Sequence, residues 1–301
     1  MSLEECLKEF LFECGIRKYT WKTIKGYRNG LEFLINYLKN EHEIISIEQV
    51  ESRHLKWFFA YQIKRGRKES YLNGLLKTYR AFFKYLMLEE YIQVNPILKV
   101  SWMKEPTNVI KTFSDDEVKR MLSAYQGNDY ISVRNRAIIA MLFDTGIRCY
   151  ELCTLTHECV NENYITIYGK GKKERQVGKS PYLAKLLMKY ERNRDYNFEH
   201  RTIKSNNYFL SRTGKPLTNS AVERIVKIAG QTAEIGDSIR CSPHTARHYY
   251  AQAQLRNGMD VYSLSRLLGH ENIKITQRYL QGLQDNEVVS RSIKSSPLMN
   301  L

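Results

Sequence analysis

Apolar residues recur at helical spacing through the first hundred residues of the chain. One such face consists of Leu31, Phe33, Leu34, Tyr37 and Leu38. A second runs through residues 75–86, and the pattern ends at Asn95-Pro96, because proline lacks the amide hydrogen that a helix needs. We therefore predict a helical domain over residues 1–100. Residues 101–110 show no period and contain Pro106, which predicts a linker.

A new helical pattern begins at residue 111. Residues 114–117 have the sequence of a capping box, and the apolar run 137–143 predicts a buried helix that ends at Gly146. Further helices are predicted at 183–187, at 222–228 behind Thr218, after Ser242-Pro243, at 260–268 before Gly269, and around Tyr279. Residues 111–291 are predicted to form the second domain, and residues 292–301 a C-terminal tail.

One short stretch has the alternation of a β-strand. Residues 164–168 are rich in tyrosine and β-branched side chains, which predicts a strand. Residues 169–175 carry four cations and predict a hairpin turn, after which Gln176-Val177 begins the return strand. The predicted fold class is therefore mainly α with a small β-sheet: a helical N-terminal domain followed by an α+β domain.

The charge of the chain points to a polyanionic partner. The 301 residues carry a formal net charge of +15 and include enough hydrophobic residues, 43%, for two cores. Such a balance favours DNA or RNA as the partner, although a basic composition alone is a weak indication. No run of about 20 apolar residues is present, so no membrane span is expected.

Six cysteines are interpreted as reduced thiols of a cytoplasmic protein, since the N-terminus lacks the pattern of a signal peptide. Cys149, Cys153, His157 and Cys159 lie close together in the sequence. Zinc sites, however, usually have a second ligand pair well downstream, which is missing here. We expect Cys149 and Cys153 to pack one helical turn apart in a core, and we expect neither a metal nor a cofactor.

Several residues suited to phosphate chemistry occur in order along the chain. His244 and Arg247 stand one helical turn apart, so both can reach one phosphate. Arg148 follows the end of a predicted helix, His270 follows Leu267-Leu268-Gly269, and Tyr279 lies nine residues beyond His270. Each piece alone is a weak signal, and the weight lies in their joint order and spacing.

This set resembles the tyrosine recombinase (phage integrase) family, and its spacings resemble those of the Xer-like simple recombinases. The family pattern is Arg, Lys, His-x-x-Arg, His or Trp, and Tyr, which is matched by Arg148, Lys170, His244, Arg247, His270 and Tyr279. The resemblance implies a core-binding SAM-like N-terminal domain and a catalytic C-terminal domain that together form a C-shaped clamp on DNA. The chain departs from the pattern after Val177, where a proline is common, and it has no separate arm-binding domain.

The chemistry of strand exchange explains why these residue types are needed. Tyr279 would attack a phosphodiester and store its energy as a 3′-phosphotyrosine, with His244 as the candidate acceptor of its proton. Arg148 and Arg247 would stabilise the charge on the non-bridging oxygens, and His270 would add a donor to the same oxygens. The resemblance assigns the general acid for the leaving 5′ oxygen to Lys170, while the sequence alone leaves Lys172 and Lys173 open.

The neighbours of these residues are expected to have ordinary roles. His248 is interpreted as a helix residue beside the site, and Tyr249 and Tyr250 as core residues rather than nucleophiles. Glu151, three residues after Arg148, either orients that guanidinium or forms a helix-surface pair with it.

The expected partner is a double-stranded DNA recombination site with inverted half-sites, bound by a homotetramer or by a heterotetramer with a paralogue. The role would be integration or excision of a mobile element, or resolution of DNA multimers. Apolar residues after Tyr279 have no obvious use in a closed monomer core: Leu283, Val288, Val289 and Ile293. The resemblance implies that this segment packs on the neighbouring subunit, and the alternative is a disordered tail. The alternatives are a type IB topoisomerase and, from another class, a non-catalytic DNA-binding regulator.

Overall fold

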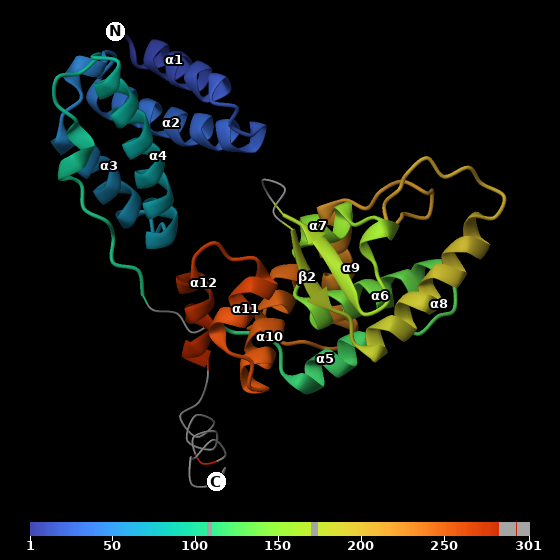
Figure 1. The fold of residues 1–301 in the computed structure, drawn as a ribbon. Helices are drawn as coiled ribbons and strands as arrows, with labels where there is room; N and C mark the ends of the chain where they lie inside the picture. Colours follow the sequence, from blue (N-terminus) through green and yellow to red (C-terminus); the bar gives the residue numbers. More distant parts are fainter. Residues whose placement is uncertain (107–109, 170–173, 283–292, 294–301) are drawn as a thin grey trace. The chain divides into compact units, whose positions relative to one another are not determined.

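The computed structural model describes residues 1–106, 110–169, 174–282 and 293 (Figure 1). The chain forms two compact units, Met1–Thr107 and Asn108–Leu301. Both units are mainly helical, and the second contains a two-stranded sheet, which confirms the predicted fold class. No helix in the described part of the chain is long and apolar enough to cross a membrane.

Four helices form the N-terminal unit. They are α1 (Leu3–Ile16), α2 (Trp21–His42), α3 (Ser52–Lys64) and α4 (Glu69–Leu88), with 3-10 turns η1 (Ile47–Gln49) and η2 (Pro96–Lys99). The predicted apolar face of α2 is confirmed, because Leu31, Leu34 and Leu38 are buried and the two aromatic residues between them are half-buried. Aromatic rings fill much of this core, and the buried Tyr79 hydroxyl donates to the Gly30 carbonyl at 3.1 Å.

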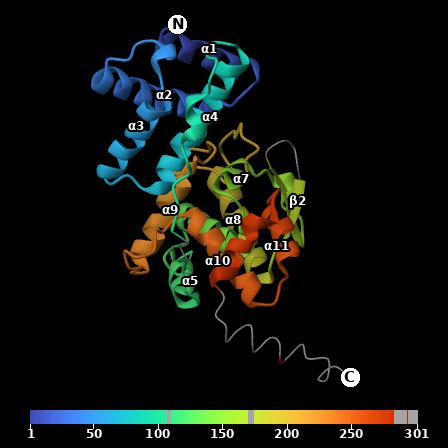
Figure 2. The same ribbon diagram turned by 90° about the vertical axis from the view of Figure 1, so that its left-hand side faces the viewer.

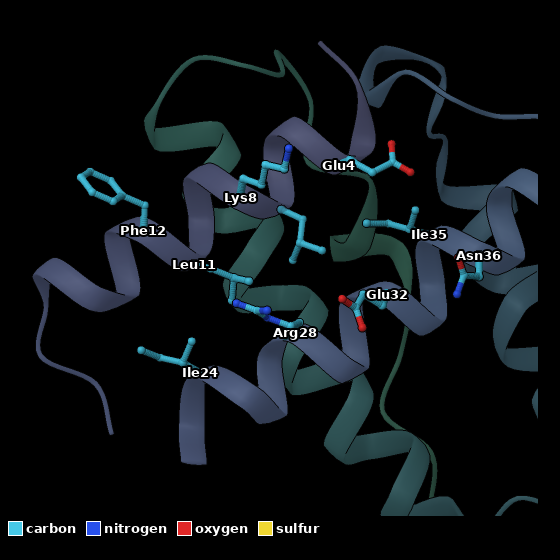
Figure 3. Close-up of a pocket in the computed structure, with 10 residues that line it drawn as sticks. Glu4, Lys8, Leu11, Phe12, Ile24, Arg28, Glu32, Ile35 and Asn36 are labelled. Carbon is cyan, nitrogen blue, oxygen red and sulfur yellow. The ribbon is translucent and has the colours of Figure 1, made fainter. Parts of the chain in front are cut away.

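An open groove of about 630 Å³ lies on this unit between α1 and α2 (Figure 3). Apolar side chains and both signs of charge line it: Glu4, Leu7, Lys8, Leu11, Phe12, Ile24, Arg28, Glu32, Ile35 and Asn36. None of the residues singled out for phosphate chemistry lies in it.

The second unit holds the remaining elements. In chain order they are α5 (Asp115–Leu122), α6 (Tyr130–Thr145), α7 (Cys149–Thr154), η3 (His157–Cys159), β1 (Tyr164–Tyr168), β2 (Glu174–Gly178), α8 (Pro181–Phe198), α9 (Asn219–Thr232), α10 (Pro243–Arg256), α11 (Val261–Leu268), α12 (Ile273–Gln277) and η5 (Arg278–Gly282). The buried helix α6 is central, since it packs against α5, α8, α9 and α10. Helices α10 and α11 lie side by side, as both views show (Figure 1, Figure 2).

Gly146 ends α6 as predicted and turns the chain toward Arg148. Its φ of 60° lies in the left-handed region, and an added Cβ would come within 2.4 Å of the Tyr250 ring on α10. Glycine is therefore required here for two independent reasons, conformation and close approach. The turn leads directly into α7, whose N-cap residue is Arg148.

The hairpin differs from the prediction in one respect. The strand at Tyr164–Tyr168 is confirmed, but the return strand begins at Glu174, so the assignment of Glu174 and Arg175 to the turn is wrong. Arg175 pairs with Ile167 in the antiparallel register, and its side chain, 10% exposed, points into the protein toward Glu151. Glu151, its ion-pair partner, lies 24 residues earlier in the sequence.

Candidate active site

Residues from four separate segments meet beside α10. Arg148 is the N-cap residue of α7, Arg247 lies on α10, His270 follows the C-terminus of α11, and Tyr279 lies in η5. An Arg247 Nη2 atom lies 3.1 Å from His270 Nε2, and the His270 and Tyr279 rings stack with centroids 6.5 Å apart. The structure thus brings together four of the six residues singled out in the sequence, and His244 joins them through His248.

Two arginines are held in place by backbone carbonyls of the surrounding turns. Arg247 is 4% exposed and donates to Gly146 O at 2.6 Å and to Leu268 O. Arg148 is more open and donates to Gly269 O at 3.0 Å. Burial, with the neighbouring charges of Arg148 and Arg175, lowers the pKa of Arg247 to about 10, so it remains a cation at neutral pH.

A single buried carboxylate joins two of the guanidinium groups. Glu151 accepts from Arg148 Nη1 at 2.9 Å and from both terminal nitrogens of Arg175 at 2.8 and 2.6 Å. It also accepts from the Arg148 backbone amide. Burial would raise the pKa of Glu151, but Arg175 and then Arg148 outweigh it and lower the pKa, so this carboxyl is ionised. Of the two expectations for Glu151, the orienting contact is the one observed.

Arg175 is a site residue that the sequence interpretation missed. Besides binding Glu151, its Nε donates to the Leu267 carbonyl at 2.7 Å, which ties β2 to α11. The partner Glu151 is remote in sequence, so no local pattern identifies the pair. Lys170, Lys172 and Lys173, the candidates for the general acid, lie outside the described residues.

His270 is neutral and has a defined tautomer in this arrangement. Because a guanidinium only donates, Nε2 accepts from Arg247, and Nδ1 therefore donates to Thr276 Oγ1 at 2.8 Å. Burial and the charges of Arg247 and Arg148 lower the pKa of His270 to about 4.

The Tyr279 hydroxyl lies against His248. Tyr279 is 3% exposed and its oxygen is 3.0 Å from His248 Nδ1. The rings of His248 and His244 are in edge contact, with centroids 4.1 Å apart, and His244 is the more exposed of the two. His248 is a helix residue beside the site, as interpreted from the sequence, but its contact with the Tyr279 hydroxyl was not predicted. Its spacing from His244, one turn along the same face of α10, is the signal that could have identified it.

The other tyrosines and the cysteines near the site are structural. Tyr250 is buried, and Tyr249 packs on Phe143 and donates to Asp115 Oδ1 at 2.9 Å, so the expectation that neither is the nucleophile agrees with their positions. Cys153 is buried and Cys149 half-buried on α7, as expected for packing. Within the described ranges, no three His, Cys, Asp or Glu residues are arranged to hold a metal ion.

Similarity to known proteins gives the class of the molecule. Residues 111–285 match the phage integrase family, and residues 7–90 match the phage integrase N-terminal SAM-like domain. The tyrosine recombinase XerC of Thermodesulfovibrio yellowstonii is 31% identical over 265 residues, which cover 85% of this chain and 84% of that protein. The tyrosine recombinase XerD of Listeria monocytogenes is 27% identical over 279 residues, which cover 92% of each.

The fold is also that of solved recombinases. The crystal structure of the XerH site-specific recombinase bound to a palindromic difH substrate has a TM-score of 0.76 at 18% identity, covering 93% of this chain and 82% of that one. The chain belongs to the phage integrase family. It is a site-specific tyrosine recombinase, an enzyme that cuts and rejoins DNA through a tyrosine nucleophile. Neither the type IB topoisomerase nor the non-catalytic regulator is favoured by these matches.

Proposed function

We propose that Arg148, Lys170, His244, Arg247, His270 and Tyr279 carry out strand cleavage in this recombinase. Arg148 and Arg247 bind the non-bridging oxygens of the scissile phosphate and stabilise the negative charge that grows on them. His270 donates to the same oxygens once its Nε2 carries a hydrogen, which it gains by protonation or by a change of tautomer. Two fixed guanidiniums supply the charge stabilisation that a metal ion provides in other phosphoryl-transfer enzymes, so no cofactor is required.

The reaction exchanges one phosphoester for another. The Tyr279 oxygen bonds to phosphorus, the bond from phosphorus to the 5′ oxygen breaks, and the DNA remains attached as a 3′-phosphotyrosine. Tyr279 loses its hydroxyl proton to a histidine of α10, and Lys170 supplies a proton to the departing 5′ oxygen. Because the phosphoester is conserved, the reverse attack rejoins a strand without a nucleotide cofactor.

The juxtaposition of Arg247, His270 and Tyr279 carries this proposal. One guanidinium nitrogen contacts the imidazole at 3.1 Å, and that imidazole stacks on the phenol ring, so a phosphate held by Arg247 lies within reach of the nucleophile. The tyrosine is also surrounded by cations, since Arg247, Arg278 and Arg148 each oppose the rise in its pKa that burial causes. Such a field favours the phenolate as it attacks an anion.

We further propose that the substrate is a double-stranded site with inverted half-sites, bound by four protomers in the cytoplasm. Residues 1–100 and 111–291 would hold the duplex as a C-shaped clamp joined by the linker 101–110. The role is integration or excision of a mobile element, or resolution of DNA multimers. The tail 292–301 and the segment before it would pack on a neighbouring protomer: Leu283, Val288 and Val289 lie outside the described residues, and Ile293 is exposed.

A trapping experiment tests the cleavage proposal. A nicked duplex, whose site the full-length protein selects from a randomised library, should form a covalent adduct with the wild type in the presence of EDTA. Tyr279→Phe should form no adduct and should bind the duplex with nearly unchanged affinity, because it loses one oxygen and no phosphate ligand. An adduct at full yield in Tyr279→Phe, or loss of all cleavage on chelation, would overturn the assignment.

A further inference from the structure

The Tyr279 hydroxyl is hydrogen-bonded to a histidine that is not among the six residues of the recombinase pattern. His248 Nδ1 lies 3.0 Å from the Tyr279 oxygen, a distance at which a proton passes directly between them. His244, the expected proton acceptor, is the exposed outer member of the pair and packs its ring on His248. Among the described side chains, His248 is the one that the Tyr279 hydroxyl contacts by a hydrogen bond.

We propose that His248 is a catalytic residue: its Nδ1 accepts the proton of Tyr279 as the tyrosine oxygen bonds to phosphorus, and returns it when the strand is rejoined. The proposal rests on the cleavage role of Tyr279 proposed above. In this step the O–H bond of Tyr279 breaks and an N–H bond of His248 forms. Neutral His248, with its hydrogen on Nε2, becomes an imidazolium.

Burial and the charges around His248 keep its ring neutral. The titratable groups that interact with it are His244 and Arg247 from α10, Arg278 and Tyr279 from η5, and His270 after α11. Burial, followed by His244, Arg247 and Arg278, lowers the pKa of His248 to about 4. The ring is therefore neutral at pH 7, with a lone pair available for the hydroxyl hydrogen.

The same charges make the basicity of His248 depend on whether a phosphate is bound. A proton on His248 is unfavourable while the neighbouring arginines are uncompensated. A bound phosphate brings negative charge between Arg148 and Arg247 and removes part of that penalty, so the basicity of His248 rises when the scissile phosphate is in place. Tyr279 therefore loses its proton more readily when the scissile phosphate is bound than when the site is empty.

Two substitutions separate a base from a packing residue. His248→Asn places an amide oxygen close to the position of Nδ1, so it can accept the hydroxyl hydrogen bond but cannot take up the proton. His157→Asn, at a histidine of the same unit that contacts Tyr208 outside the site, is the matched control, and His244→Asn tests the alternative base. We expect His248→Asn to lower the single-turnover rate of adduct formation by about 100-fold, the lower end of the range for general base catalysis. DNA affinity should stay within about twofold, and His157→Asn should cleave at close to the wild-type rate.

A modified substrate shows which proton transfer is lost. With sulfur in place of the bridging 5′ oxygen, the leaving group needs no acid, so a Lys170→Ala protein should regain its cleavage rate. His248→Asn should remain slow on this substrate, because its defect is at the attacking oxygen. Recovery of His248→Asn on the sulfur substrate, or a wild-type rate on the ordinary one, would overturn the proposal. A large defect confined to His244→Asn would assign the base to His244.

A spectroscopic measurement keeps the test independent of cleavage. In full-length protein with ¹⁵N-labelled histidine, the Nδ1 resonance of His248 should be that of a hydrogen-bond acceptor with hydrogen on Nε2, and should shift in Tyr279→Phe. A His248 that carries its hydrogen on Nδ1, or that is unaffected by Tyr279→Phe, would contradict the proposal. If the wild type forms no adduct at all, the cleavage assignment of Tyr279 fails, whereas a wild-type adduct with unimpaired His248→Asn removes only the role of His248.

Discussion

Replacement of Glu151 by glutamine tests how the arginines of the site are held. Glu151 is 5% exposed and Arg175 is 10% exposed, so theirs is a buried ion pair, whereas Arg148 at 41% is largely solvated. Glu151→Gln keeps the size of the side chain but removes its charge and leaves Arg175 without a counter-ion. Breaking a buried pair from one side costs about 3 to 5 kcal/mol. The more exposed pair with Arg148 adds little to this.

The expected loss is large enough to measure by thermal unfolding. For a unit of this size, about 3 kcal/mol corresponds to a decrease in Tm of roughly 6 to 12 °C. Calorimetry of the full chain should show this shift in the transition of the catalytic unit, and the transition of the N-terminal unit, which has its own core, serves as an internal reference. Asp116→Asn is the control, since Asp116 and Lys119 form a pair in which both side chains are more than 75% exposed.

The pH dependence of the effect has a defined sign. The folded-state pKa of Glu151 is lowered, so its stabilisation is fully present above the unfolded value of about 4.3 and is lost as pH falls through the folded value. The difference in Tm should therefore be constant between pH 7 and pH 5 and should narrow below about pH 4. A Glu151→Gln protein that melts within 1 °C or so of the wild type would refute the view that this carboxylate anchors the site.

Two other changes follow from the described geometry. Gly146→Ala should destabilise the catalytic unit by at least about 1 to 3 kcal/mol, because the residue has a positive φ and its Cβ would meet the Tyr250 ring; Gly236→Ala, which meets no atom within 4 Å, is the control, and equal denaturant midpoints would contradict the account. Truncation after Gly282 should leave gel-shift binding to one half-site unchanged while weakening cooperative binding to a full site and recombination; normal cooperativity would mean that the C-terminal segment does not join protomers.

The parts of the fold that depend on local pattern were predictable from the sequence. The apolar face of α2, the end of α6 at Gly146 and the strand β1 follow from spacing and from the conformational needs of single residues. The start of β2 was not predictable, because Arg175 pairs with Ile167 in the hairpin while its charged side chain is held by Glu151 on α7, a partner remote in sequence. Local reasoning places a charged residue next to glycines and lysines in a turn.

The site likewise contains residues that the sequence predicted and a contact that it did not. The order of Arg148, Arg247, His270 and Tyr279 suggested that they act together, and the structure places them together. Tyr279 was singled out among 21 tyrosines by its spacing from His270, but its contact with His248 joins residues 31 positions apart and follows from no local pattern. The catalytic role of each residue remains a prediction for the trapping and rate experiments.

The sharing of Glu151 by two arginines has a consequence for the energetics of the whole catalytic unit. Among the described residues of the site, Arg148 and Arg175 both bind this one carboxylate, and burial, followed by the charges of these two arginines, lowers the pKa of Arg247. The folded protein is thus electrostatically frustrated where it works, and a bound phosphodiester supplies the missing anion. Because the bound DNA reduces the repulsion between the arginines, its binding stabilises the folded catalytic unit. A mutation that removes one of these positive charges would therefore raise the stability of the free protein and lower its affinity for DNA.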